Sequence, residues 1–301
     1  MAVDLAVVPV AGLGTRLLPA TKSQPKEMLP VGRRPVVQYV VEELAHAGIR
    51  RILFVTGYGK SSIEDFFDVN RQLISHLRHT GKEEQLAELA FERNEVEYAY
   101  TRQREQLGLG HAVLCGEPFV GRDPFVVALG DSIIGMHGQS RVLERMIDEF
   151  ERTQADVVVA FEELADPREV VHYGIAQPRG PVGDVFELES LVEKPSIEQA
   201  PSRLAVAARY VFRPSIFGEL KQTERGKGGE IQLTDAMQTI LKRGGKGVGI
   251  RLPKNERRFD IGNFESYFRA FVDFALADPQ FGPGLKTYLT EQLRDELTNR
   301  S

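Results

Sequence analysis

Apolar residues along the first half of the chain form short runs that alternate between strand-like and helix-like spacing. Strands of the buried type are predicted where β-branched and aromatic residues gather, at 4–10, 51–56, 96–100 and 125–129. Helices are predicted at 37–44, 61–93 and 110–114, and Gly48 supplies a stop for the first of them. This alternation predicts a largely parallel sheet covered by helices.

The pattern changes after a predicted helix at 142–150. Three predicted strands, 156–161, 185–192 and 204–212, follow one another with loops rather than helices between them, which predicts an antiparallel extension of the same sheet. Helices resume at 231–241, and a later one carries an apolar face of Phe264, Phe268, Phe271 and Ala275. A break at 278–283 precedes a short charged helix. One compact domain with a helical tail is therefore expected.

Composition and charge narrow the class of protein. The chain has 301 residues, of which 42% are hydrophobic and 27% charged, as in ordinary globular proteins. A net charge of −5 argues against broad nucleic-acid binding, yet a few well-placed cations would still bind a small anionic substrate. The single cysteine, Cys115, fits the reducing cytoplasm. No basic residue precedes Arg16 and no apolar run nears the roughly 20 residues of a membrane helix, so neither a signal peptide nor a membrane partner is expected.

A glycine-containing loop follows the first predicted strand. Gly12 and Gly14 match the start of a dinucleotide-binding loop, but Leu17 stands where the third glycine would be. These glycines allow backbone N–H groups to approach a base or a triphosphate, and Arg16 and Lys26 place two cations nearby. The alternative is a plain turn with solvent-facing cations.

A second possible phosphate loop, Gly59-Lys60-Ser61, lacks the earlier glycine of a Walker loop because Phe54 stands at that position. It is better interpreted as a strand-to-helix turn in which Ser61 or Ser62 caps the helix. We therefore expect no phosphate site there.

Two aspartates are candidate metal ligands. Asp131 comes just after the predicted strand 125–129, at the sheet edge where open α/β folds bind ligands. Asp260 could be the second ligand of a Mg²⁺ ion, which prefers oxygen ligands and shared substrate phosphates. A helix N-cap for Asp131 and a turn position for Asp260 are the structural alternatives. Glu193 and Lys194 end another strand before Pro195, and both can reach one ligand only if the strand ends or bends there.

Several longer motifs together resemble one family. They are residues 9–22, 25–30, 54–57, 107–113, 192–195, 229–236 and 258–262, in this order along nearly the whole chain to about position 277. Their sequences resemble those of the bacterial UTP–glucose-1-phosphate uridylyltransferases, also called UDP-glucose pyrophosphorylases. The resemblance implies a Rossmann-like three-layer α/β sandwich with a mixed, mainly parallel central sheet. It also implies a nucleotidyltransferase domain at 1–277, with a nucleotide-binding half at about 1–135, a sugar-phosphate-binding half at about 136–277, and a helical tail at 278–301.

The resemblance assigns roles to matching residues. It implies that the nucleotide is bound by Ala11, Gly12, Gly14, Thr15, Gln103 and Gly108, and an amide such as that of Gln103 can both donate to and accept from uracil. It implies that the sugar phosphate is bound by Gly174, Glu193 and Lys194. Arg16, Lys26 and Lys194 are the expected catalytic cations, and Asp131 and Asp260 the expected ligands of Mg²⁺.

The implied reaction is an in-line attack of glucose 1-phosphate on the α-phosphorus of UTP, which yields UDP-glucose and pyrophosphate. The attacking phosphate is already anionic, so positioning and electrostatics are expected to dominate catalysis without a covalent nucleophile. Cys115 is interpreted as core packing, and His111 as a helix-start or catalytic residue. Relatives form homodimers or homotetramers, so an oligomer is expected.

Two departures leave alternatives open. Gly130 stands where many relatives carry proline, as in the related thymidylyltransferases that use dTTP, and Asn263-Phe264 replaces the Ser-Lys of many uridylyltransferases. The insertion at 71–93 and the tail favour the uridylyl branch. A non-catalytic nucleotide-sugar-binding protein and a dehydrogenase are further alternatives. A protein that had lost turnover would lack a metal carboxylate or a phosphate-binding lysine, and this chain keeps Asp131, Asp260, Lys26 and Lys194. The absent third glycine disfavours a dehydrogenase.

Overall fold

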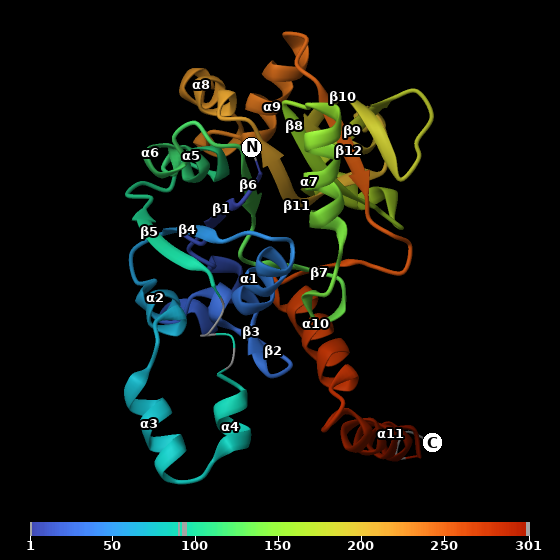
Figure 1. Ribbon diagram of the computed structural model, residues 1–301. Helices are drawn as coiled ribbons and strands as arrows, with labels where there is room; N and C mark the ends of the chain where they lie inside the picture. The colour runs from blue at the N-terminus through green and yellow to red at the C-terminus, as the bar shows by residue number, and fades with distance from the viewer. Residues whose placement is uncertain (1, 90, 92–94, 299–301) are drawn as a thin grey trace.

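The computed structural model describes residues 2–89, 91 and 95–298, which form a mixed α/β fold around a nine-stranded sheet (Figure 1). From one edge to the other its strands are β5 (Glu97–Arg102), β4 (Arg51–Thr56), β1 (Leu5–Pro9), β6 (Phe125–Ala128), β11 (Leu204–Phe212), β8 (Val157–Glu163), β12 (Gly247–Arg251), β10 (Val185–Glu193) and β9 (Gly174–Arg179).

Most strands of this sheet run in one direction. Neighbours β5, β4, β1 and β6 are parallel to one another, and β12 is parallel to β8. Strands β11 and β10 are antiparallel to their neighbours and so run against the rest. The expectation of a mixed sheet with an antiparallel extension is confirmed, because the run of strands without intervening helices in the second half pairs as expected. Parallel pairing predominates only in the first half of the chain.

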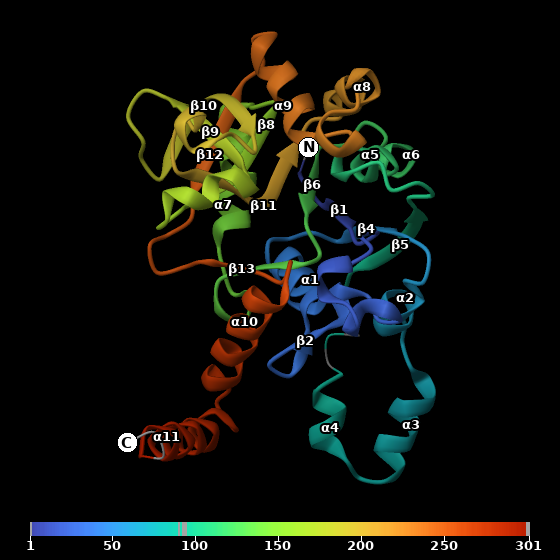
Figure 2. The ribbon, with the colours of Figure 1, turned by 180° about the vertical axis from the view of Figure 1, so that it is seen from behind.

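Helices cover both faces of the sheet (Figure 2). Successive residues of β1 point to opposite faces. Leu5 and Val7 therefore belong to one core cluster, and Ala6 and Val8 to the other. One face is covered by α1 (Val36–His46), α2 (Ser61–Phe67) and α7 (Val142–Thr153). The other is covered by α5 (Leu109–Leu114), α6 (Glu117–Val120), α8 (Ser215–Gln222) and α9 (Leu233–Lys242). Burial on both faces explains why β1 has no alternating polar positions.

The predicted helix at 61–93 is wrong as a continuous element. The described part of it forms three helices, of which α2 is followed by α3 (Arg71–His79) and α4 (Glu83–Ala87), while residues 90 and 92–94 lie outside the described part. Asn70 accepts a hydrogen bond of 2.9 Å from the Leu73 amide and so starts α3 as a new helix. Gly81, with φ of +67°, turns the chain between α3 and α4, which project together from the body (Figure 1).

Two small sheets were not predicted from the sequence. Strand β7 (Ser132–Ile134) pairs with β13 (Arg258–Asp260), and β2 (Pro30–Val31) pairs with β3 (Arg34–Pro35). Strands of two or three residues carry too few positions for a periodic signal. In addition, β7 and β13 lie far apart in the sequence. The first pair is important because it lies at the candidate site.

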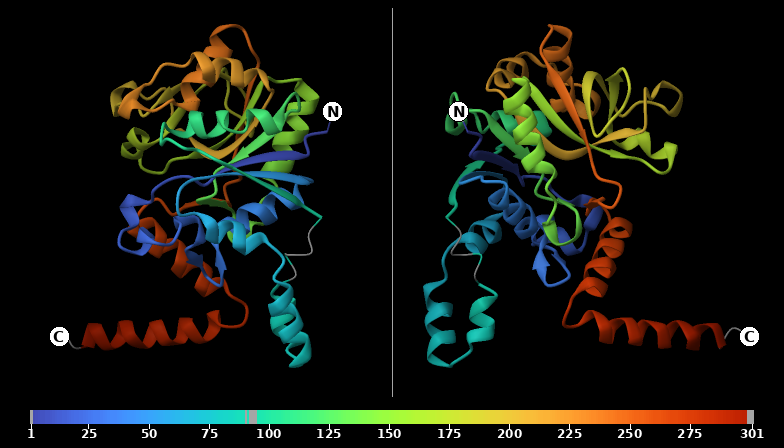
Figure 3. Two further views of the ribbon diagram at one scale, coloured as in Figure 1. Left: turned by 90° about the vertical axis from the view of Figure 1, so that its left-hand side faces the viewer. Right: turned by 45° about the vertical axis from the view of Figure 1, so that its right-hand side comes forward.

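The helix α10 (Phe264–Ala277) presents a different face to the core from the predicted one. Ala270 and Phe274 are buried beside β13, whereas Phe268 is 59% exposed and Phe271 38% exposed. The aromatic residues gave both faces an apolar character, so spacing alone selected the wrong one. Beyond α10, α11 (Gly282–Thr298) leads away from the body (Figure 3). Within the part of the chain that the structure describes, no helix combines the length and the apolar character needed to cross a membrane.

Candidate active site

A cavity of about 260 Å³ opens at the carboxyl ends of β1 and β6. This is the edge at which open α/β sheets bind ligands. Residues from five separated segments line the cavity: Pro9, Ala11, Gly12, Lys26, Glu27, Gln103, Gln106, Gly108, Leu109, Ala112, Leu129, Asp131 and Glu230. The structure therefore brings together Ala11, Gly12, Lys26, Gln103, Gly108 and Asp131, which the sequence had placed in one site.

The amide of Gln103 is oriented by its neighbours. Its Nε2 donates to the Gly108 carbonyl at 3.0 Å and lies 3.1 Å from Nδ1 of His111. Gly108 has a φ of +91°, and a Cβ on it would lie 2.6 Å from the Cβ of Glu230, so only glycine fits this close approach. With both protons of the nitrogen directed to these two groups, the amide oxygen is the atom that can accept from a ligand. His111 holds Gln103 here and also lies in the first turn of α5.

The other residues expected at the nucleotide lie outside the cavity lining. Gly14, with φ of +66°, precedes a 3₁₀ turn of Thr15–Leu17, and Thr15 and Arg16 are exposed. The Arg16 guanidinium is nevertheless close to Asp260. A Cβ placed on Gly262 would be 3.1 Å from both the Arg16 Nη2 atom and the Asp260 Oδ2 atom. The structure thus brings Arg16 toward one of the two carboxylates rather than into the cavity.

Asp131 and Asp260 come together through the β7–β13 pair. Asp131 precedes β7, Asp260 ends β13, and Ser132 of β7 pairs directly with Asp260. The Ile261 amide also donates to the Asp131 backbone carbonyl at 3.3 Å. Neither aspartate has the role that the structural alternatives gave it, because Asp131 enters a strand rather than a helix and Asp260 belongs to a strand.

Lys26 neutralises Asp131. Its ammonium forms a hydrogen-bonded ion pair with Asp131 Oδ2. Burial would lower the pKa of Lys26, but the carboxylates of Asp131 and Glu27 outweigh it and raise the pKa. Burial works against ionisation of Asp131 too, and the Lys26 charge overcomes it and lowers the pKa of that carboxyl. Asp260 differs, because burial and then the Asp131 charge raise its pKa above the ordinary value.

The two carboxylates fit a Mg²⁺ ion that shares its coordination with substrate phosphates. Both are oxygen ligands, and they meet on adjacent backbone segments beside the cavity. No group of three or more His, Cys, Asp or Glu side chains with metal-site geometry occurs among the residues that the structure describes. A divalent ion held by these two carboxylates would therefore take its remaining ligands from substrate phosphates and water, as Mg²⁺ commonly does.

We expect Asp260→Asn to raise the melting temperature of the metal-free protein by about 2 °C at neutral pH. Because the folded-state pKa of Asp260 is raised, folding loses stability as pH rises through that pKa, and asparagine removes this loss. The gain should disappear at acidic pH, where Asp260 is protonated. Calorimetry with chelator from pH 4 to pH 8 checks this, and a lower melting temperature at pH 7 would contradict it.

Glu193, Lys194 and Gly174 meet where β10 ends. Glu193 is the last residue of β10 and pairs with Gly174 of β9, while Lys194 has a positive φ of 44°. The strand therefore does end between the two charged residues. As a result the Lys194 Nζ lies 3.2 Å from Glu193 Oε1 instead of pointing to the opposite face. Thr234 donates to Glu193 Oε2 at 2.7 Å and fixes that carboxylate.

Sequence reasoning missed Arg258. Its guanidinium stacks 4.6 Å from the centroid of the Tyr173 ring, and its Nε lies 3.5 Å from Glu162 Oε2. Burial lowers the pKa of Arg258, but Asp260 and its other anionic neighbours raise it on balance, so Arg258 is a fixed cation beside the two aspartates. The alternation of side chains in β13 could have revealed it, because residues 258 and 260 share one face of a strand.

Gly59-Lys60-Ser61 is a strand-to-helix turn as expected, but the predicted serine cap is wrong. The N-cap of α2 is Lys60, which makes no side-chain cap, and the Ser62 hydroxyl is buried without a hydrogen-bond partner among the residues described. Lys60 instead turns inward and forms a buried ion pair of 2.9 Å with Glu27. A buried carboxylate needs a charge partner, and Lys60 supplies one to Glu27.

Cys115 is half-buried and packs against the core of the face covered by α5, as expected. Burial raises the pKa of its thiol, so at neutral pH it is protonated and unreactive.

Comparisons with known proteins show the family to which the chain belongs. A family model described as nucleotidyl transferase matches residues 5–276. A UTP–glucose-1-phosphate uridylyltransferase of Bacillus subtilis is 45% identical over 291 residues, which are 97% of this chain and 96% of that protein. The structure of a UTP-bound UGPase from Acinetobacter baumannii superposes with a TM-score of 0.86 at 38% identity, covering 96% of this chain and 99% of the other. A UDP-glucose pyrophosphorylase complexed with UDP-glucose gives a TM-score of 0.81 at 38% identity, covering 90% and 98%.

The fold and the family match define an enzyme class, and the chain belongs to the nucleotidyl transferase family. Identity of this extent over nearly the full length of both chains is decisive within that family. The chain is a member of the UTP–glucose-1-phosphate uridylyltransferases, the group its motifs resemble.

Proposed function

We propose that this chain transfers the uridylyl group of UTP to glucose 1-phosphate, forming UDP-glucose and releasing pyrophosphate with Mg²⁺ as cofactor. The observation that carries the proposal is the convergence of Gln103, Lys26 and Asp131 around one cavity, with Asp260 paired next to Asp131. Gln103 and Lys26 line the cavity, and Asp131 connects it to Asp260 through β7. Family membership supports the reaction class.

Base recognition is assigned to Gln103, with Ala11, Gly12 and Gly108 forming the walls. The Gln103 oxygen accepts from N3–H of uracil, because its nitrogen is directed to Gly108 and His111. Cytosine carries an acceptor at N3, so its lone pair would face the Gln103 oxygen. A buried mismatch of this kind strongly disfavours binding.

Phosphate charge is neutralised by cations from three separate segments. Lys26 stays protonated next to Asp131 and turns toward the triphosphate, with Gly14 and Thr15 on the preceding loop and Arg16 at the Asp260 side. Lys194 orients the attacking phosphate of the sugar, and Glu193 accepts from the sugar hydroxyls beside Gly174. Asp131 and Asp260 would hold the Mg²⁺ ion, which when bound supplies Lewis-acid neutralisation of the phosphate oxygens.

In this mechanism no residue serves as a strong base or a covalent nucleophile. The attacking oxygen is ionised at pH 7, so the residues hold two anions in line and exclude water from them. Most of the acceleration then comes from fixed charges that need no rearrangement during the reaction.

The two departures from the family pattern have packing explanations, so neither is evidence for thymidylyl over uridylyl transfer. A Cβ on Gly130 would lie 2.5 Å from Cγ1 of Val10, so glycine at 130 accommodates a bulky neighbour rather than a base. Asn263 accepts from the Ser266 amide at 3.0 Å and caps α10. Neither residue is among those lining the cavity.

Pyrophosphate release measured with UTP, dTTP, CTP and ATP against several sugar 1-phosphates tests the proposal. We expect UTP with glucose 1-phosphate to have a kcat/KM about tenfold above dTTP, and about 100-fold or more above CTP and ATP. Loss of turnover without added Mg²⁺ is also expected. A preference for dTTP would reassign the protein to the thymidylyl branch. UTP-dependent thermal stabilisation without any turnover would instead indicate a binding protein.

The proposal extends to the domain organisation and assembly of the protein. We place the Rossmann-like nucleotidyltransferase domain at 1–277, with its nucleotide and sugar-phosphate halves meeting near 135, and the helical tail at 278–301. The protein is proposed to act in the cytoplasm as a homodimer or homotetramer, which light scattering would measure.

A further inference from the structure

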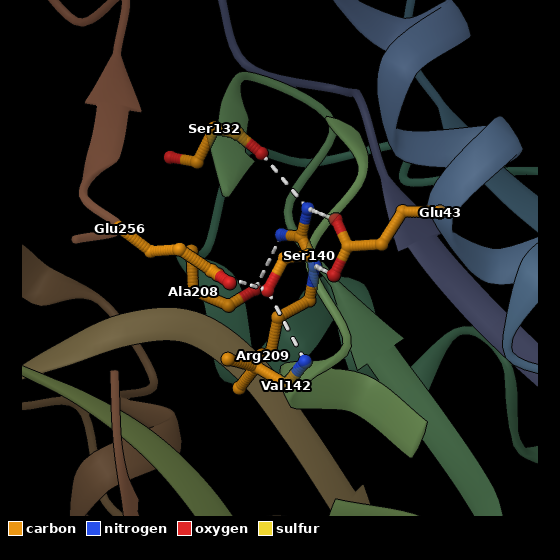
Figure 4. A network of polar contacts seen from close by, with 7 residues as sticks. All are labelled: Glu43, Ser132, Ser140, Val142, Ala208, Arg209 and Glu256. Atoms are coloured by element: carbon orange, nitrogen blue, oxygen red, sulfur yellow. Dashed lines mark hydrogen bonds and ion pairs between the residues drawn. The ribbon is translucent and has the colours of Figure 1, made fainter. Parts of the chain in front are cut away.

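A buried ion pair lies directly behind the two carboxylates and does not touch the cavity. Arg209 of β11 and Glu43 of α1 are both fully buried, and the guanidinium contacts the carboxylate twice, at 3.1 Å from Nε and 2.6 Å from Nη2. The pair links the sheet to the helix layer (Figure 4). Burying two charges costs desolvation energy, and apolar residues of similar volume often stabilise as well. Packing alone therefore does not explain this pair.

The Arg209 guanidinium has two further contacts, and both lead to the segment that carries Asp131. Its Nη2 donates to the Ser132 carbonyl at 3.0 Å, and its Nη1 donates to the Ala208 carbonyl at 3.0 Å. The Ala208 carbonyl also accepts from the Leu129 amide at 3.1 Å. Figure 4 shows the guanidinium between Glu43 and the Ser132 carbonyl. Arg209 therefore contacts the chain on both sides of Asp131, directly at the Ser132 carbonyl and through the Ala208 carbonyl at the Leu129 amide.

The same contacts act on Asp260. Ser132, whose carbonyl Arg209 holds, pairs with Asp260 across β7 and β13. A shift of the Ser132 backbone would therefore move both carboxylates. Asp131 would move because it is covalently bonded to Ser132, and Asp260 because it pairs with Ser132 in the sheet.

The backbone at Ala208, next to Arg209, has an unusual conformation. Ala208 has a φ of +60°, which is uncommon for a residue with a side chain, and the pairing of β11 with β8 is irregular between Val206 and Tyr210. A left-handed alanine is strained and persists only where the surroundings impose it. Here the irregularity turns Arg209 toward Glu43 and Ser132 while Arg209 remains in register with Ala128 of β6.

From these contacts we propose that Arg209 is a positioning residue, with Glu43 as its charge partner, that fixes the spacing of Asp131 and Asp260 for a divalent cation. The inference rests on the metal site of the proposed function and concerns residues that touch neither substrate nor metal. Groups that orient metal ligands typically change metal affinity by 10- to 100-fold when substituted. The clamp, defined as Arg209, Glu43 and the carbonyls of Ser132 and Ala208, is expected to act in this way.

The test measures binding of Mn²⁺, a spectroscopic substitute for Mg²⁺, to the full chain saturated with UDP-glucose and without pyrophosphate, so that no turnover occurs. Arg209→Lys keeps the charge but cannot contact Glu43 and both carbonyls at once. We expect its Mn²⁺ Kd to rise about tenfold, with the metal-free Kd for UDP-glucose changed less than twofold. Glu43→Gln, which leaves the Ser132 contact in place, should raise the Mn²⁺ Kd by only about threefold.

Two further variants separate positioning from stability. The double variant Arg209→Met with Glu43→Leu removes both charges together and should fold, yet still weaken Mn²⁺ binding about tenfold. Arg51→Met removes ion pairs of 2.6 and 3.0 Å with Asp4 and Asp123 at the amino ends of β1, β4 and β6, opposite the cavity. It should leave the Mn²⁺ Kd unchanged.

The outcomes distinguish the clamp from the metal site on which it rests. Folded Arg209 variants that bind Mn²⁺ within twofold of the unsubstituted protein would overturn the clamp alone. Equal weakening in Arg51→Met, or parallel loss of metal-free UDP-glucose binding, would reduce Arg209 to a stabilising residue and overturn it too. Absence of Mn²⁺ binding in the unsubstituted protein would overturn the metal site together with the clamp.

Discussion

Asp131→Asn should lower kcat by about 10³-fold while the protein remains folded. Asparagine keeps the size of the side chain but loses the negative charge that would hold Mg²⁺ against the phosphates. It also leaves the Lys26 ammonium without the partner to which it is now bonded. Steady-state pyrophosphate release over a range of Mg²⁺ concentrations measures the loss, and excess Mg²⁺ should not restore the rate.

The stability of this variant gives a second, independent readout. Because the pKa of Asp131 is lowered in the folded state, its charge stabilises folding at neutral pH, and this contribution is lost as pH falls through the folded pKa. Asp131→Asn should therefore melt lower than the unsubstituted protein at pH 7, and the difference should shrink in acid. This is the opposite sign to Asp260→Asn, although the two carboxylates are neighbours.

Asp123→Asn is the matched control, since Asp123 is an ion-paired carboxylate just before the amino end of β6, at the end of that strand opposite the cavity. It should retain normal kcat. If Asp131→Asn keeps more than a tenth of the activity, Asp131 has no central part in the mechanism.

Lys194→Ala should reduce kcat/KM for glucose 1-phosphate by about 100-fold and leave the KM for UTP within about twofold. The ammonium that orients the attacking phosphate is lost, whereas the nucleotide cavity does not include residue 194. Alanine and lysine pay a similar backbone cost at the positive φ of 44°, so the folded state should be equally stable. Initial rates with each substrate varied in turn provide the measurement.

Lys221→Ala is the control for general charge loss, because Lys221 is an exposed lysine on α8 that pairs with Glu117. Its kinetics should be unchanged. A Lys194→Ala enzyme with normal glucose 1-phosphate kinetics would show that Lys194 only forms a surface pair with Glu193. In that case the attacking phosphate must be oriented by another cation, and Arg258, a buried cation that interacts with Asp260, is a candidate.

The site was predictable to different depths in its different parts. The loop after β1 and the strand before Asp131 were evident, because a strand buried on both faces leaves an uninterrupted apolar run that a glycine or a carboxylate then breaks. Arg258 and Thr234 lay inside motifs, yet their roles depend on Tyr173 and Glu193, which the chain brings near only after folding. The buried ion pair of Lys60 was missed for a similar reason, since its partner Glu27 is distant in the sequence.

Errors in the fold follow the same logic. The helix at 61–93 was predicted as continuous because its composition favours helix, while Asn70 and Gly81 act as local breaks whose effect depends on a single cap and a single φ. The face of α10 was misassigned because phenylalanines occupy both sides of that helix. Strand β12 escaped prediction because its two glycines disfavour a strand, and pairing with β8 and β10 supplies the missing stabilisation.

Local pattern was sufficient to predict the α/β class, the parallel strands of the first half and the family, and to nominate charged residues for the site, because each depends on neighbours in the chain or on short motifs. The pairing of Asp131 with Asp260, the end of β10 at Glu193 and the clamp of Arg209 on Ser132 depend on contacts between residues far apart in sequence. A buried charge such as Arg209 carries no periodic signal. Its position is set by the partners that balance the cost of removing it from water, and folding alone brings those partners together.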